Sequence, residues 1–195
     1  MDSGSGLESG ARDYVGNIYT PMLRGNLAHT SSVIVSRERI EKVKQFDESL
    51  AISGEDHDFH FRTCKWGDVC FVDLSLTLYQ VEIGDRLTLR KKETALNFLK
   101  TVQGAIAREK GNGTFPPAMI HEVLAEAHSW IAEELLKEKD YAGVRKHALL
   151  GLQYEIWQPR LICVLGVASV PRVISEPLLR SYRSCKCLIS GSKRN

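Results

Sequence analysis

The stretch SGEDHDFHFR, Ser53 to Arg62, brings together three carboxylates, two imidazoles and a guanidinium. A carboxylate at the start of a helix can accept the proton of a substrate hydroxyl when the side chain faces a cleft. General base catalysis of this kind accelerates a reaction by about 10²–10⁴-fold. The adjacent acids Glu55 and Asp56 are therefore candidates for acid–base chemistry.

The same residues also fit a purely structural role. Ser53, Gly54, Glu55 and Asp56 match the S-x-x-[DE] capping box, in which the Ser53 hydroxyl accepts from the N–H of Asp56 and the Asp56 carboxylate accepts from the N–H of Ser53. Both acids would then lie in the first turn of a helix, where the helix dipole favours each negative charge by about 0.3–1 kcal/mol. The two interpretations need not compete, because a carboxylate can cap a helix and still face a cleft.

Metal ligation is the less favoured interpretation of this stretch. The motif Asp56-His57-Asp58 is an Asp-X-Asp sequence, but helical carboxylates two residues apart diverge and do not converge on one ion. A single helix also supplies at most two or three of the four ligands that structural zinc needs. The possible zinc ligands are His57, His60, Cys64 and Cys70. Because no second ligand cluster accompanies them, the sequence predicts no metal site.

Short strands and helices are expected to position these residues. The β-branched run 29–36 predicts a buried strand, and 68–73 and 76–82 predict two more. Apolar spacing predicts a short helix from Arg37 that ends before Phe46, and a second helix from about Glu55 to Trp66 with Gly67 as its C-cap. These elements define an α+β region.

The character of the chain changes near residue 86. From Leu87 to Arg183 the apolar residues recur with a helical period, interrupted by the GNGTFPP break at 111–117. The predicted organisation is a flexible leader over 1–13, an α+β region over 14–86, an all-helical C-terminal region over 87–184 and a basic tail over 185–195. The helix pair at 118–154 resembles one TPR-like hairpin.

Composition limits the function classes. The 195 residues are 43% hydrophobic and 26% charged, which is typical of a globular protein and excludes global disorder. The net charge of +2 argues against a dedicated nucleic-acid binder. Five cysteines without a Cys-X-X-Cys pair, and a start that lacks the pattern of a secretory signal, predict a reduced, cytoplasmic chain. The basic tail could make peripheral contact with an anionic membrane surface.

Between Leu23 and Asp85 the sequence contains a series of short motifs whose order and spacing can be compared with those of known families. The set comprises Gly25-Asn26, Arg37-Glu38, Phe46-Asp47-Glu48, Glu55-Asp56, Asp58, Arg62, Gly67 and Tyr79. In order and spacing it resembles the acceptor-side half of the family 2 glycosyltransferases, which have the GT-A fold. The chain departs from the family at Lys44-Gln45, where two glycines are frequent, and at Gln80, where arginine is usual.

The resemblance implies an inverting transfer of a sugar from a nucleotide-sugar donor to a glycan or lipid-linked acceptor. It assigns the role of base to Asp56, with Glu55 beside it. The residues implied at the substrate are Asn26, His29, Asp58 and Arg62. It also implies a divalent cation, Mg²⁺ or Mn²⁺, whose ligands belong to a nucleotide-binding half of the family and are not expected here. A βαβ unit takes roughly 30 residues or more, and too few precede Gly25 to form one.

Two functions are thus predicted. The first is a truncated, partial GT-A-like acceptor-side fragment, followed by a helical region, that lacks donor binding by itself. The alternative is a non-catalytic helical protein-interaction module. A solenoid needs about three repeats, so the single TPR-like pair at 118–154 is expected to pack on its neighbouring domain.

Overall fold

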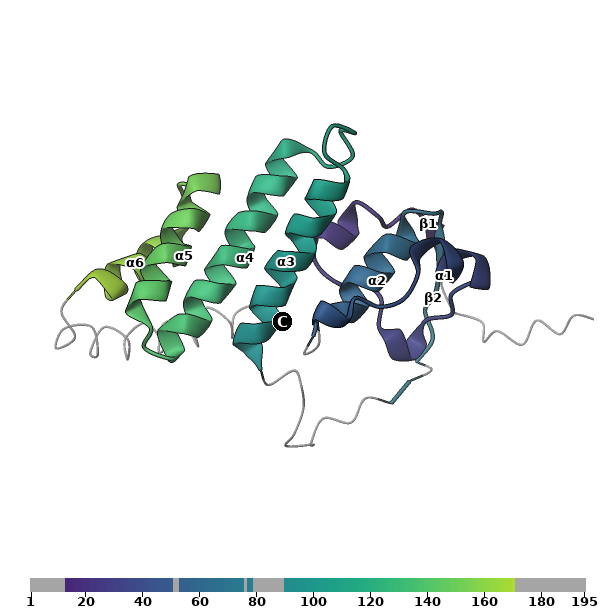
Figure 1. The fold of residues 1–195 in the computed structure, drawn as a ribbon, viewed down its shortest axis with the longest axis horizontal. Coiled ribbons are helices and arrows are strands. Elements are labelled where there is room, and N and C mark those ends of the chain that lie inside the picture. Colours follow the sequence, from purple (N-terminus) through teal and green to yellow (C-terminus); the bar gives the residue numbers. More distant parts are fainter. Residues whose placement is uncertain (1–12, 51–52, 76, 79–89, 171–195) are drawn as a thin grey trace, which may run out of the picture. The chain divides into compact units, whose positions relative to one another are not determined.

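The structure is a computed structural model that describes residues 13–50, 53–75, 77–78 and 90–170 (Figure 1). The chain divides into two compact units, unit 1 over Met1–Pro116 and unit 2 over Pro117–Asn195. The described part is mostly helical, with one small sheet, which confirms an α+β chain with a helical C-terminal region. The predicted boundary near residue 86, the basic tail and nearly all of the leader lie outside the described residues.

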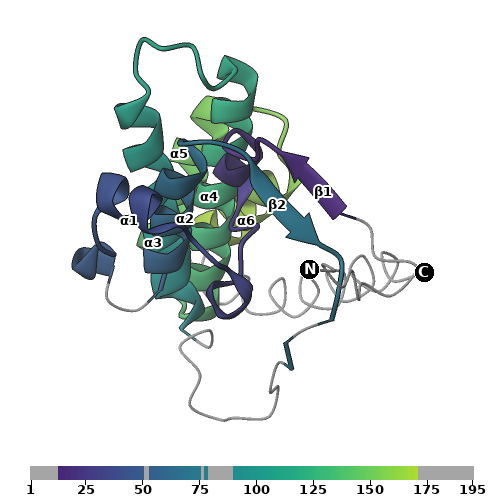
Figure 2. The ribbon, with the colours of Figure 1, turned by 90° about the vertical axis from the view of Figure 1, so that its right-hand side faces the viewer.

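Unit 1 holds the sheet and most of the short elements. Strand β1 pairs antiparallel with β2, in a register that places Gly16 opposite Val69 (Figure 2). Helix α2 contacts both α1 and α3. The elements are β1 (Asp13–Gly16), α1 (Arg37–Val43), α2 (Glu55–Cys64), β2 (Val69–Val72) and α3 (Lys91–Arg108), with 3₁₀ helices η1 (Pro21–Arg24), η2 (Thr30–Ser32) and η3 (Glu48–Leu50).

Helix α2 lies at the centre of unit 1. Seven of its residues are buried, including both of its histidines and Asp58. Phe61 is 1% exposed and meets the rings of Tyr19 and Phe115 at centroid distances of 4.8 and 6.0 Å. The aromatic cluster joins the start of the unit, α2 and the segment after α3. Offset and edge-to-face ring pairs of this kind add about 0.5–1.5 kcal/mol each beyond their buried area.

The prediction of a buried strand at 29–36 is wrong. Thr30–Ser32 forms the 3₁₀ helix η2, and the side chain of Ile34 is fully exposed. Within the described residues no strand pairs with this segment. A β-branched run becomes a strand only when a neighbouring strand and a packed face support it, and this run has neither here.

The other local predictions fare better. The helix from Arg37 and the helix from Glu55 are confirmed as α1 and α2, and β2 confirms the strand predicted over 68–73. Lys65 is the residue that caps α2, while Gly67 follows with a φ of 140°. The strand predicted over 76–82 falls almost wholly outside the described residues, and its two described members, Thr77 and Leu78, belong to no regular element.

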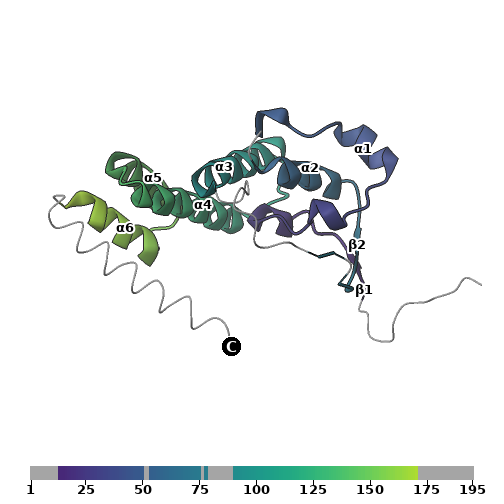
Figure 3. The ribbon, with the colours of Figure 1, turned by 90° about the horizontal axis from the view of Figure 1, so that it is seen from below.

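The described part of unit 2 contains three helices that pack on one another (Figure 3). They are α4 (Pro117–Lys137), α5 (Tyr141–Tyr154) and α6 (Pro159–Ser169). The Asp140 side chain caps α5 by accepting from the N–H of Gly143 at 3.0 Å, and a proline begins α6, where a missing N–H costs nothing. The buried core includes Ala132, Leu136, Val144, Ala148, Leu161 and Val164. None of the helices in the described part of the chain has the length and apolar composition needed to cross a bilayer.

Gly151 of α5 lies where α4, α5 and α6 meet. A Cβ atom there would lie 2.5 Å from Leu161 Cδ1, 3.2 Å from His128 Cβ and 3.4 Å from the Ala125 oxygen. We expect Gly151→Ala to lower the free energy of unfolding of unit 2 by about 1–3 kcal/mol, because overpacking outweighs the helix propensity that alanine adds. Urea unfolding followed by circular dichroism measures the difference.

The matched control is Gly166→Ala in α6. Gly166 is exposed, and a Cβ atom there meets nothing within 4 Å. The control variant should gain up to about 1 kcal/mol, since only the helix propensity changes. Equal gains for both glycines would contradict the close packing at Gly151.

Candidate functional site

The two candidate acids, Glu55 and Asp56, lie in the first turn of α2, but this turn does not form the predicted capping box. Gly54 is the N-cap, with a φ of 92° that glycine adopts without strain, and no side chain caps the helix. The Ser53 hydroxyl instead donates to Thr94 Oγ1 at 3.1 Å, and its carbonyl accepts from Asn97 Nδ2 at 2.8 Å. The predicted capping box is therefore wrong, because contacts with α3 turn Ser53 away from the helix it precedes.

Asp56 lies at the surface of this turn with its carboxylate held by two donors. Asn26 Nδ2 donates to Asp56 Oδ2 at 3.0 Å, and the backbone N–H of His57 donates to Asp56 Oδ1 at 2.7 Å. Each carboxylate oxygen can accept more than one hydrogen bond, so both retain capacity for a further donor. The side chain of Asp56 is half-buried and that of Asn26 is exposed, which leaves the pair accessible to a ligand.

A buried histidine holds Asn26 near Asp56. His57 Nε2 donates to the carbonyl oxygen of Met22 at 2.8 Å, which assigns the proton of the neutral ring to Nε2. The ring is 4% exposed and stacks on Phe98, with centroids 5.7 Å apart. Burial lowers the pKa of His57, so the side chain stays neutral near pH 7. Helix α2 is thereby tied to η1, and Asn26 follows η1 after a single glycine.

His29 lies on the segment that approaches the second turn of α2. Thr30 Oγ1 and His60 Nε2 share a hydrogen bond of 3.2 Å, and the carbonyl oxygen of His29 accepts from Ser32 Oγ at 3.0 Å. The side chain of His29 is exposed, whereas His60 is buried and burial lowers the pKa of His60. The structure thus places His29 on a loop tethered to the helix that carries Asp56.

Asp58 and Arg62 make contacts inside unit 1. The Asp58 side chain is 7% exposed and accepts from Arg62 Nε at 2.8 Å and from Arg108 Nη2 at 3.2 Å. Arg62 also donates to the carbonyl oxygens of Val43 and Gln45, where α1 ends. These two side chains join α2 to α1 and α3, and the contacts face inward.

One oxygen of Glu55 has no protein partner among the described residues. Glu55 Oε2 is buried and accepts no hydrogen bond there. A buried polar atom left unpaired costs about 1–3 kcal/mol, so a water or ligand donor at this position would be favourable. The orphan oxygen belongs to the residue next to Asp56, in the first turn of α2.

The described residues do not form a metal centre. No three His, Cys, Asp or Glu side chains among them lie close enough together to hold a metal ion. His57 and Asp58, two members of the Asp-X-Asp sequence, already have the partners described above. Cys64, Cys70 and Cys163 are free thiols.

Two residues that hold neighbouring segments of the chain on α2, next to Asp56, were not predicted from the sequence. His57 and Thr30 fix the segments that carry Asn26 and His29, and neither had a role in the predicted site. The position of His57 directly after Asp56 was the only sign available, because its partner is the backbone of Met22, 35 residues away.

Comparison with protein-family models, with curated proteins and with solved structures gives no match to this chain. A functional assignment therefore depends on the geometry at Asp56 and on the motifs between Leu23 and Asp85.

Proposed function

We propose that unit 1 is the acceptor-binding part of an inverting, family 2-like glycosyltransferase with a partial GT-A architecture. One observation carries the proposal. Asn26 and Asp56 belong to two separate motifs of the resemblance, and their side chains are joined by a hydrogen bond of 3.0 Å at the surface of unit 1. The order and spacing of the motifs do not by themselves imply this contact, and it supports a single site built from both motifs.

Asp56 would act as the general base. As the acceptor hydroxyl attacks the anomeric carbon of the donor sugar, its proton passes to Asp56 and the nucleoside diphosphate leaves from the opposite face. The bonds from Asn26 and from the His57 N–H fix the carboxylate orientation, so that it need not reorganise during the transfer. Glu55 Oε2, which is buried and has no partner among the described residues, would accept from a second hydroxyl of the acceptor.

Asp58 and Arg62 would have a structural role, in place of the substrate contact that the resemblance implies. Their inward contacts hold α2 in place between α1 and α3, so they position Asp56 without touching the substrate. A divalent cation would bind the donor diphosphate, and the described residues do not supply a site that fits it. No step at this site would therefore involve a cation, and the donor would be bound by residues beyond this site.

The decisive test replaces the base in a protein that carries a donor-binding half together with this chain. We expect Asp56→Asn to lower turnover by about 10²-fold or more while the circular dichroism spectrum stays unchanged, because the amide cannot accept the proton. Asp68→Asn, an exposed position in the same unit, is the control and should keep the wild-type rate. Wild-type turnover in Asp56→Asn would show that another group is the base.

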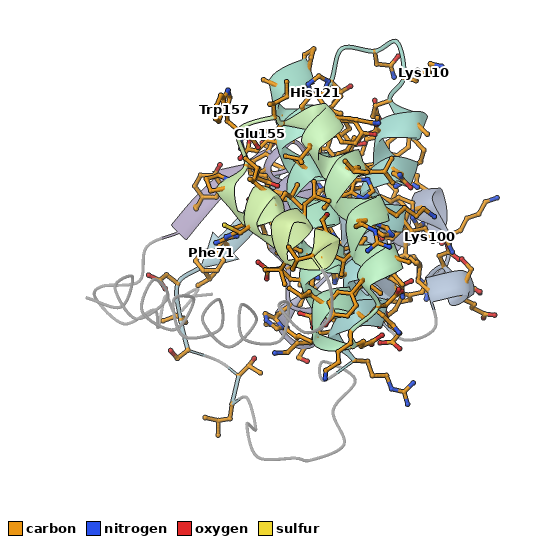
Figure 4. All side chains as sticks on the ribbon, turned by 90° about the vertical axis from the view of Figure 1, so that its left-hand side faces the viewer. Phe71, Lys100, Lys110, His121, Glu155 and Trp157 are labelled. Atoms are coloured by element: carbon orange, nitrogen blue, oxygen red, sulfur yellow. The ribbon has the colours of Figure 1, made fainter. Side chains whose placement is uncertain are left out.

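The alternative, a helical interaction module, is favoured by one feature of unit 2. Ile156 and Trp157 are 73% and 85% exposed at the turn between α5 and α6, where Trp157 projects away from the helices (Figure 4). Exposed aromatic residues are enriched at protein interfaces. This surface does not depend on Asp56.

Amide NMR on this chain separates the two functions. Titration with glucose, galactose and N-acetylglucosamine at millimolar concentration should shift the signals of Asn26, Asp56 and His57 if unit 1 binds an acceptor sugar. Shifts that appear only around Trp157, and only with a protein partner, would favour the interaction module.

A further inference from the structure

Two histidines face each other across the α4–α5 interface of unit 2. His128 on α4 is 4% exposed and His147 on α5 is half-buried. Their Nδ1 atoms lie 3.0 Å apart, and their ring centroids 5.2 Å apart, so the two rings meet edge to edge. One Nδ1 must carry a hydrogen and the other a lone pair, because two N–H groups or two lone pairs would repel at this distance.

The arrangement suits a shared proton better than a shared metal ion. In an edge-to-edge pair the N–H and the lone pair point at each other, whereas metal ligands point their lone pairs at a common third position. No additional His, Cys, Asp or Glu in the described part of the chain completes a metal site with them. The pair is therefore a hydrogen bond between two helices.

The surroundings of the pair disfavour a second positive charge. Burial, and then the nearby His147, lower the pKa of His128 to about 4. Burial also lowers the pKa of His147, with Lys146 adding to the effect and Asp140 opposing it. Tyr154 of α5 stacks on His128 with centroids 6.0 Å apart, and α6 approaches through the apolar Leu161 beside Gly151.

We propose that the His128–His147 pair is an acid-sensitive clamp that holds α5 against α4 and releases it when both imidazoles are protonated. The first proton leaves the clamp closed, since a charged His147 can donate its Nδ1 hydrogen to neutral His128. The second proton places hydrogens on both Nδ1 atoms, which removes the bond and sets two positive charges side by side.

The direction of the pH effect follows from the protons bound in each state. An unfolded histidine takes up its proton near pH 6.5, whereas folded His128, with its pKa of about 4, does so only in more acidic solution. Between these values the unfolded chain binds more protons, so the stability of unit 2 is complete above pH 6.5 and falls as the pH drops toward 4.

Thermal unfolding of the full chain tests the clamp. The NMR signals of Val144 and Ala148, two buried core residues, report the unfolding of unit 2. We expect the Tm measured from them to fall by about 10 °C or more between pH 7 and pH 4.5. The double variant His128→Leu/His147→Leu should lose most of this pH dependence. His121→Leu, an exposed histidine on α4, is the control and should behave as the wild type does. The same fall in the double variant as in the wild type would overturn the proposal.

A second measurement uses the wild-type protein, so it tests the proposal even if the double variant does not fold. Nitrogen-15 NMR of the wild-type imidazoles at pH 7.5 reports which ring nitrogen carries the hydrogen. The clamp requires one of the two rings to be protonated at Nδ1 and the other at Nε2. Two Nε2–H rings would show that the shared hydrogen bond is absent, and would overturn the proposal.

Discussion

Replacing Glu109 with alanine is expected to lower the free energy of unfolding of unit 1 by about 3 kcal/mol, because one buried carboxylate accepts from four donors worth about 1 kcal/mol each. Glu109 is 6% exposed and follows α3 directly. It accepts from Tyr19 at 2.8 Å, Thr114 at 2.9 Å and Asn112 at 3.1 Å, and it pairs with Lys65. The expected loss of stability is smaller than the summed energy of the four hydrogen bonds, because the Lys65 side chain is 45% exposed and can be solvated by water when its partner is removed.

The effect should also appear in the pH dependence of stability. Burial raises the pKa of Glu109, but the bonds from Lys65, Asn112, Tyr19 and Thr114 outweigh it and lower the pKa to about 2. A lowered pKa adds stability above the unfolded value of 4.5, and the stability is lost as the pH falls toward 2. Glu109→Ala should lose this acid dependence.

Urea unfolding at pH 7 and at pH 3 measures both effects. The control is Glu38→Ala, whose side chain is 77% exposed and pairs with Lys42 one turn away. Such a surface pair contributes little to stability, because water and salt screen the two charges. A Glu109→Ala variant as stable as Glu38→Ala would mean that the buried network adds little to unit 1.

The second large effect is expected at Asp58. Asp58→Ala removes the charge partner of Arg62, whose side chain is only 19% exposed and whose other bonds are to the carbonyl oxygens of Val43 and Gln45. Breaking a buried ion pair from one side costs about 3–5 kcal/mol. Because Arg108, the other partner, is 41% exposed and loses little, we expect a value near the lower end, about 3 kcal/mol.

Chemical denaturation of three aspartate variants isolates this effect. Asp58→Asn keeps the shape and one acceptor oxygen, so it should fall between the wild type and Asp58→Ala. Asp68→Ala, at an exposed position, should change the stability by less than about 0.5 kcal/mol. If Asp58→Ala were as stable as Asp68→Ala, the carboxylate would be free to serve a ligand, as the sequence resemblance implies.

The helices were the part of the fold most open to prediction from sequence. Their apolar period is a local property, so α1, α2 and the helices from Lys91 onward follow from the pattern. The failure at 29–36 has the opposite cause. Whether Val33 and Ile34 form a strand depends on a pairing partner, and no periodicity within the segment contains that information.

In the candidate site, too, the sequence identified individual residues, whereas contacts with residues far along the chain decide how their side chains are used. The sequence pointed to Asn26 and Asp56 separately, and the structure joins them by a hydrogen bond. The Ser53 motif failed as a cap because its partners, Thr94 and Asn97, lie on α3. Nor could spacing alone reveal that Asp58 faces inward, since only one of its two partners, Arg62, is one turn away on α2, and the other, Arg108, lies 50 residues away.

The pairing of β1 with β2 has a consequence for how unit 1 acquires its structure. The two strands enclose η1, η2, α1, η3 and α2 in one long loop, because Gly16 meets Val69 across that whole stretch of sequence. Closing a long loop costs chain entropy before the new contacts can compensate for it. The two-stranded ribbon should therefore assemble late, after α2 and its neighbours have collapsed, and its amide hydrogens should be among the first in unit 1 to exchange with solvent.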